Sequence, residues 1–295
     1  FFLLAASLFL SACQPQVVDI ELPPHVPRLV VHADWRVGER DVWLYAGRSV
    51  GILDAMRLDS GSNGINTPED AYRNTAWVEN ANIELFANGQ WLGTFTPNPL
   101  TRTYRLSLSE PLDTQIRYEL IANAAGFPAV NSQQRLSSAS AAEISRFQSG
   151  GARGTQGEIL DLLEIQLPAN SEKTYVEAAL VLYPRDTLSG SEPMMPLLQS
   201  PDPNVITLGA GRAYLSYSQA TTLLLHVSAI DTMQYSARLR LSSISAEQYT
   251  YYRSLSDYYL AQGNPFAEPV VLYSNIDGGR GLFALRAEDW LTVVE

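Results

Sequence analysis

Residues 82–96 read NIELFANGQWLGTFT, and this stretch decides the fold class. Two runs rich in branched and aromatic residues, 82–86 and 90–96, flank the pair Asn88-Gly89. A two-residue hairpin turn needs positive φ at both positions, which Asn and Gly accept. The stretch therefore predicts two antiparallel strands joined by a tight turn.

Short segments of the same kind surround this hairpin. In 103–108, Tyr104 and Leu106 alternate with polar residues, and 115–123 repeats the pattern. Period two is typical of a strand with one face in water. Further strand candidates are residues 28–35 and 41–46. Several short strands with turns between them predict a sandwich, so residues 28–137 are expected to form an immunoglobulin-like β-sandwich.

The second half of the chain continues in the same style after an interruption. Residues 138–157 are rich in Ser, Ala and Gly, which predicts a linker or long loop, with room for a short helix within 139–147. Residues 158–295 are predicted to form a second β-rich, sandwich-like domain. Its strand candidates are 159–167, 174–183, 212–217, 221–227, 235–241, 270–273 and 282–285. The fold class is therefore mainly β, with two β-sandwich-like domains.

One helix is expected in the second domain, over residues 245–262. Ser245 and Gln248 have the spacing of a capping box, and aromatic and apolar side chains follow at three- and four-residue spacing. Gly263 and Pro265 are suited to end the helix. We expect this helix to pack on the sheet of its domain.

The first residues predict export. Residues 1–12 are almost wholly apolar and too short to span a bilayer, so they fit a signal peptide that lacks its first residues. Leu10-Ser11-Ala12-Cys13 resembles the lipobox of bacterial lipoproteins, in which the cysteine is acylated. Cys13 is the only cysteine of the chain. We therefore expect a lipid anchor at Cys13, with residues 13–27 as a Pro-rich tether.

The residue after Cys13 bears on the location of the protein, and the net charge bears on its partners. Gln14, and not Asp, follows the cysteine, which by analogy with lipoprotein sorting indicates the outer membrane, on a face that the sequence leaves open. The chain has 20 basic and 31 acidic residues, and its only lysine is Lys173. A nucleic-acid-binding face has to be cationic, so nucleic acid is not an expected partner.

Two segments carry a family resemblance. Cys13 is followed by Val18-Asp19-Ile20-Glu21-Leu22-Pro23, and near the end the chain reads Asn264-Pro265-Phe266-Ala267-Glu268-Pro269 and then Tyr273-Ser274-Asn275-Ile276. Both segments resemble the Bacteroidetes-type lipoprotein family catalogued as domain of unknown function 4249. The resemblance implies an exported, lipid-anchored, β-rich protein. Genes of this family often lie beside TonB-dependent receptors, which implies an accessory of an outer-membrane transporter.

Candidate chemistry is sparse, and no enzyme, cofactor or metal is predicted. His32 and Asp34 point the same way from one strand, but no third metal ligand is indicated. The loop from Asp59 to Asp70 partly matches a calcium loop, although Gly61 supplies no side-chain oxygen at the third position. Calcium binding there stays open beside a plain solvated loop.

The tyrosines of the expected helix are the remaining candidates. Tyr249, Tyr251 and Tyr258 could form a ligand or partner surface, but packing of the helix in the core is the favoured explanation. The sequence thus favours a non-catalytic outer-membrane lipoprotein that binds a ligand or a TonB-dependent receptor. A surface hydrolase acting on polymers and a purely structural envelope protein remain as alternatives.

Overall fold

The structure is a computed structural model of the 295-residue chain. The structure describes residues 25–50, 76–136, 141–154, 156–185, 192–208, 211–262, 268 and 270–295. Within these residues the protein is mainly β, as the sequence predicts, and the one helix whose bounds are described is α4 (Ala246–Ala261).

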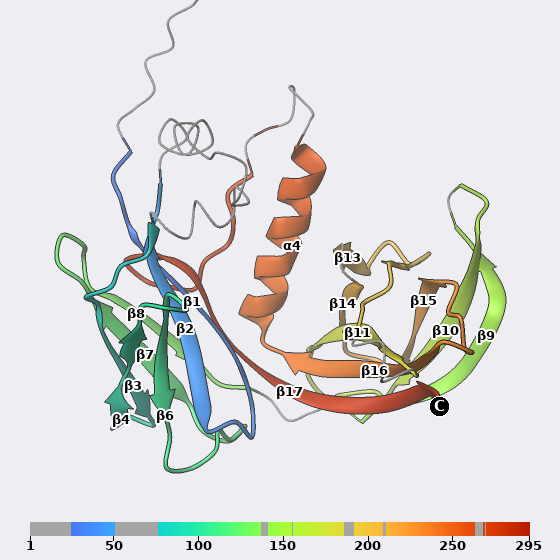
Figure 1. The fold of residues 1–295 in the computed structure, drawn as a ribbon, viewed down its shortest axis with the longest axis horizontal. Coiled ribbons are helices and arrows are strands. Elements are labelled where there is room, and N and C mark those ends of the chain that lie inside the picture. Colours follow the sequence, from blue (N-terminus) through green and yellow to red (C-terminus); the bar gives the residue numbers. More distant parts are fainter. Residues whose placement is uncertain are drawn as a thin grey trace, which may run out of the picture.

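A nine-stranded sheet runs through the whole molecule (Figure 1). In order across the sheet, its strands are β13 (Ile206–Leu208), β14 (Arg212–Tyr217), β11 (Thr174–Pro184), β16 (Tyr235–Ile244), β17 (Arg280–Val294), β1 (Leu29–Arg36), β2 (Asp41–Arg48), β6 (Thr103–Ser107) and β5 (Thr96–Asn98). Strands from both halves of the chain therefore belong to one sheet.

Two four-stranded sheets complete the architecture. One contains β4 (Gln90–Thr94), β3 (Asn82–Ala87), β7 (Tyr118–Asn123) and β8 (Val130–Gln134). The other contains β12 (Leu198–Gln199), β15 (Thr221–Ser228), β10 (Ile159–Leu167) and β9 (Glu143–Arg153). Each packs against one half of the large sheet, which gives two sandwiches with separate hydrophobic cores.

The strand alternation decides which side chains enter these cores. Along β1, every second side chain from Leu29 to Trp35 is buried in the core of the first sandwich. The Trp35 ring packs on Phe95, from the link between β4 and β5, at 5.7 Å and edge-on against Phe283 of β17 at 4.9 Å. Its indole N–H donates to the carbonyl of Trp43 at 2.6 Å, so this large side chain is buried with its polar atom satisfied.

The strand β17 serves both sandwiches. It pairs in parallel with β1 and antiparallel with β16. Phe283 and Leu285 belong to the core of the first sandwich, whereas Leu291 and Val293 pack against the core of the second. In Figure 1 this long red strand runs from one half of the molecule to the other. The first sandwich thus receives a strand from outside residues 28–137.

The helix α4 lies on the other face of the large sheet. Its nearest strands are β17, β11, β13 and β14. Tyr249 and Tyr252 pack on Tyr214 of β14 and Ile244 of β16, as expected for a helix that covers the sheet of its domain. Among the described residues, none forms a helix with the length and hydropathy that spanning a bilayer requires.

Local predictions fare differently along the chain. The hairpin is confirmed, with Asn88 at φ 49° and Gly89 at φ 83° between β3 and β4. The expected linker at 138–157 instead holds the eleven-residue strand β9, so a helix within 139–147 is wrong from residue 143 onward. Most side chains of β9 are exposed on both faces, and therefore no alternation marks it. The strand predicted at residues 270–273 is wrong, because none of these residues is in a strand.

Candidate functional site

The amino end of α4 is fixed by its own sequence. Ser245 follows β16 in an extended conformation, and its hydroxyl accepts the backbone N–H of Gln248 at 3.1 Å. The capping residue is therefore the predicted one. The Gln248 side chain differs from the capping-box expectation, because its amide donates to Asp34 of β1 at 3.4 Å. This contact ties the first turn of the helix to β1, the strand of the first sandwich that pairs with β17.

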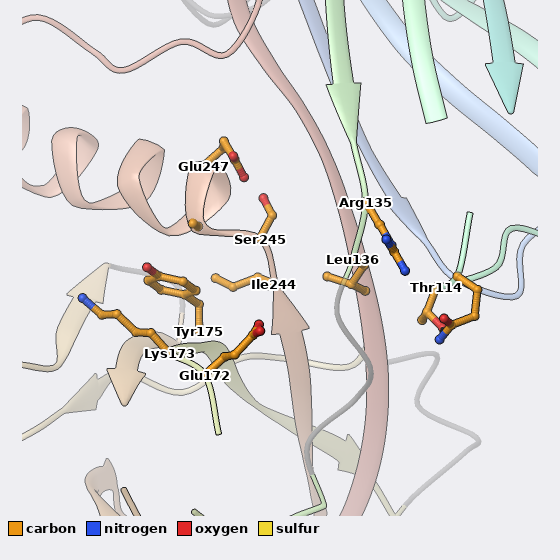
Figure 2. Close-up of a pocket in the computed structure, with 11 residues that line it drawn as sticks. Thr114, Arg135, Leu136, Glu172, Lys173, Tyr175, Ile244, Ser245 and Glu247 are labelled. Carbon is orange, nitrogen blue, oxygen red and sulfur yellow. Dashed lines mark hydrogen bonds between the residues drawn. The ribbon is translucent and has the colours of Figure 1, made fainter. Parts of the chain in front are cut away.

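A cleft of about 550 Å³ opens beside this helix end (Figure 2). Its lining combines residues of the first sandwich with residues of the second: Thr114, Gln115, Arg135 and Leu136 on one side, and Glu172, Lys173, Tyr175, Ile244, Ser245, Ala246 and Glu247 on the other. The volume lies in the range of small-molecule sites, which form preferentially where domains meet.

The two walls of the cleft carry different charges. Arg135 stands on the wall of the first sandwich, next to Leu136 and Thr114 in Figure 2. The facing wall holds Glu172 and Glu247 with a single cation, Lys173. We call these the Arg135 wall and the glutamate wall. Among the described residues, no ion pair joins one wall to the other.

Two neighbouring side chains pack against the ring of Tyr175, the aromatic residue of the cleft. The Lys173 ammonium lies 5.6 Å from the centre of the Tyr175 ring, and the Tyr249 ring lies 5.2 Å from it at an angle of 42°. Tyr175 is half-buried as a result. Its ring therefore contributes to the floor and to holding α4, and presents little free face to a ligand.

Beneath α4 the sheet carries a chain of alternating charges. Arg286 lies between Asp34, at 2.5 Å, and Glu288, at 2.8 Å. Arg240 continues it, at 3.7 Å from Glu288 and 2.6 Å from Glu177. These residues come from β1, β17, β16 and β11, and Glu177 is fully buried. The network links four neighbouring strands on the face that the helix covers.

Burial shifts several pKa values in this region. It raises the pKa of Asp34 above its ordinary value, with the Arg286 charge acting in the opposite direction. Burial also raises the pKa of Tyr252 to about 12, and that of Tyr214 above its ordinary range. The pKa of His32 is lowered, because burial penalises its charged form. None of these four described residues lines the cleft.

The structure does not bring the three predicted tyrosines into one surface. Tyr249 is buried on the side of α4 that faces the sheet, against Tyr175. Tyr251 is half-buried, with its ring 6.1 Å from that of His32. Tyr258 is exposed, and its ring contacts that of the next residue. Core packing therefore accounts for the first tyrosine, and only the last is open to a partner.

Other predicted positions divide between described and undescribed residues. His32 and Asp34 do lie on the same face of β1, but Asp34 is engaged by Arg286 and Gln248. No group of three metal-ligating side chains occurs in the described segments. Cys13 and the loop 59–70 lie outside the described residues.

Sequence reasoning missed the charged residues of the cleft. Arg135 and Glu172 stand near strand ends that are distant in sequence, so no local pattern joins them. The charge network under α4 is easier to predict from the sequence, since Arg286 and Glu288 alternate with the buried Leu285 and Ala287. Period-two polar residues within a strand that is buried on its other face are the signal that could have revealed it.

Comparison with known proteins places the chain in a family. The family model described as "Domain of unknown function (DUF4249)" matches residues 16–289. The chain belongs to the DUF4249 family. This confirms the resemblance to domain of unknown function 4249 over residues 16–289, while the lipid anchor at Cys13 stays a prediction. No curated protein matches this DUF4249 chain.

Solved structures similar to this DUF4249 protein are distant. A Salmonella alpha-2-macroglobulin mutant is 14% identical with a TM-score of 0.24, over 80% of this chain and 15% of the macroglobulin. The Escherichia coli alpha-2-macroglobulin is 13% identical with a TM-score of 0.22, over 91% of this chain and 14% of the other. The chain thus spans about one seventh of their length. At these scores the likenesses carry no inference about DUF4249.

Proposed function

We propose that this DUF4249 protein is a non-catalytic lipoprotein of the outer membrane, which binds a ligand or protein partner as an accessory of a TonB-dependent transporter. The observation that carries the proposal is Cys13, the only cysteine of the chain, placed directly after an apolar run and the small residues Ser11 and Ala12. A cysteine acylated with more than one chain anchors a protein stably in a bilayer.

The cleft supports a binding role. It lies where the two sandwiches meet, and its charged side chains Arg135, Glu172 and Lys173 are exposed. A ligand held there contacts both halves of the molecule at once. Such a ligand would be presented by a protein that a Pro-rich tether holds near the membrane.

A non-catalytic role agrees with the placement of the titratable groups. Catalytic sites usually combine a cleft with groups of strongly shifted pKa. Here the groups with large shifts, such as Tyr252 of α4 and Tyr214 of β14, pack between the helix and the sheet, and Asp34 is tied to Arg286 and Gln248. The cleft and the shifted groups are separate features of this fold.

Lipidation is tested by feeding producing cells a labelled fatty acid. The full-length protein should take up label and remain with the membrane, whereas a Cys13→Ala variant should lose both properties. A Ser11→Thr variant, which keeps the cysteine, serves as the control for the altered segment. Equal labelling of the parent and the Cys13→Ala variant, or no label in either, contradicts the proposal.

The partnership is tested separately by purifying the tagged protein from membranes solubilised in mild detergent. A TonB-dependent receptor should co-purify in amounts comparable to the tagged protein. Recovery of the tagged protein alone, with the receptor no more abundant than from an untagged strain, contradicts the transporter role.

A further inference from the structure

We infer that the cleft between the two sandwiches binds a short zwitterionic peptide, with the peptide carboxylate on the Arg135 wall and its amino group on the glutamate wall. This inference rests on the proposed binding function and names its ligand class. Three observations carry it: the charges of the two walls, the Tyr175 ring that Lys173 and Tyr249 already cover, and the polar groups at the start of α4.

The walls favour a ligand that carries both signs of charge. The guanidinium of Arg135 makes no ion pair with any described residue, and neither do Glu172 and Glu247. An anion alone would meet the repulsion of two carboxylates, and a cation alone would meet Arg135 and Lys173. A ligand with one charge at each end pairs with both walls, because opposite potentials are then matched.

The aromatic ring argues against a carbohydrate. Sugars are commonly held by stacking on an open aromatic face, and among the described residues that line the cleft Tyr175 is the only aromatic one. Lys173 and Tyr249 already lie against its ring. The ring therefore offers no free platform for a pyranose.

The remaining lining suits a peptide backbone. Thr114 and Gln115 offer hydrogen-bonding side chains beside Arg135. The first backbone N–H groups of a helix have no partner within it, so those of Ala246 and Glu247 can donate to peptide carbonyls. Leu136 and Ile244 line the cleft but are almost fully buried, so the polar groups and the two charged ends of the peptide carry the recognition.

The binding test uses isothermal titration calorimetry on the full chain in detergent, at low ionic strength. The probes are Ala-Leu-Ala with free ends, the same peptide amidated at its carboxyl end, and the same peptide acetylated at its amino end. The free peptide should bind most tightly. Blocking either end should weaken binding about three- to fivefold, the effect of removing one exposed ion pair.

Variants assign each end to its wall. Arg135→Gln should weaken the free peptide about three- to fivefold and leave the amidated peptide unchanged. Glu172→Gln with Glu247→Gln should weaken the free peptide and leave the acetylated one unchanged. Arg253→Gln is the charge-matched control, since Arg253 is exposed on α4 and outside the cleft, and it should bind like the parent.

Several results would overturn the inference. They are the absence of binding by all three peptides, equal binding by all three, or an Arg135→Gln effect that does not depend on the carboxylate. Tighter binding of maltotriose or inorganic phosphate than of the free peptide would assign the cleft to another ligand class and also overturn it. Fatty-acid labelling is read independently, so lipidation without peptide binding rejects this inference alone.

Discussion

Gly281 of β17 lies directly against the backbone of Val31 in β1. A Cβ added to Gly281 would overlap the carbonyl oxygen of Val31, and the glycine also has a φ of +117°. The parallel pairing of the first and last strands therefore depends on a residue without a side chain at this position.

Gly281→Ala is expected to destabilise the protein by about 3 kcal/mol or more, because overlap with Val31 adds to backbone strain. Gly126→Ala is the matched control, since Gly126 has a φ of +85° and open space around its Cβ position. That control should lose only about 1–2 kcal/mol, the effect of the backbone angle alone. Urea unfolding measures both. Equal losses would show that the close approach to Val31 is unimportant.

Arg240→Met is expected to reduce the free energy of unfolding by about 3–5 kcal/mol. The substitution leaves the fully buried Glu177 without the guanidinium that lies 2.6 Å from it. Arg238→Met, on the same face of β16 but exposed, is the control and should change stability by less than about 1 kcal/mol.

The same experiment can separate attraction from desolvation. In a variant that carries both Glu177→Leu and Arg240→Met, much of the lost stability should return, because no buried charge is then left unpaired. A double variant that is less stable than Arg240→Met alone would contradict a network held mainly by charge pairing.

The acid dependence of stability should reflect Asp34. Burial raises its pKa in the folded protein, so the folded state keeps this proton at pH values where the unfolded chain has lost it. Its contribution to the free energy of unfolding is therefore greatest below the ordinary value of 3.8 and declines as the pH rises through the folded pKa. Urea unfolding over this pH range should show the decline in the parent and not in Asp34→Asn. An increase with pH in the stability of the parent relative to Asp34→Asn would have the opposite sign and contradict the assignment.

Ser245→Ala should destabilise the protein by about 1 kcal/mol, because the hydroxyl that accepts the Gln248 N–H is lost. Ser256→Ala, in the middle of α4, removes a hydroxyl of the same kind without touching a cap and should be close to neutral. Thermal unfolding followed by circular dichroism compares the two. A similar loss of stability in the two variants would show that the capping hydrogen bond of Ser245 does not stabilise the protein.

The sequence predicts the parts of this fold that depend on neighbours along the chain. Asn88-Gly89 determines a hairpin, and Ser245 begins a helix, because a turn and a cap involve only a few consecutive residues. The sequence does not predict that β1 pairs with β17, since the two strands are separated by most of the chain. The alternation within each strand predicts the strand itself and not its partner. Such pairing is decided by tertiary packing.

The cleft could not be predicted from the sequence for the same reason. Arg135 and Glu172 become neighbours across a cleft only after two sandwiches have formed on one sheet. The aromatic character of Tyr249 predicts a binding surface, whereas its burial against Tyr175 explains it as a packing residue. A pattern of tyrosines on a helix does not distinguish a covered face from an open one until the partner of the helix is known.

The placement of β17 has a consequence for how the protein matures. The ribosome makes β1 long before β17, its neighbour on one side. Until β17 has been made, Trp35 lacks the Phe283 ring against which it packs, so the first sandwich cannot reach its final state. Its folding must wait for β17 and should be slow, as is usual when contacts join distant segments.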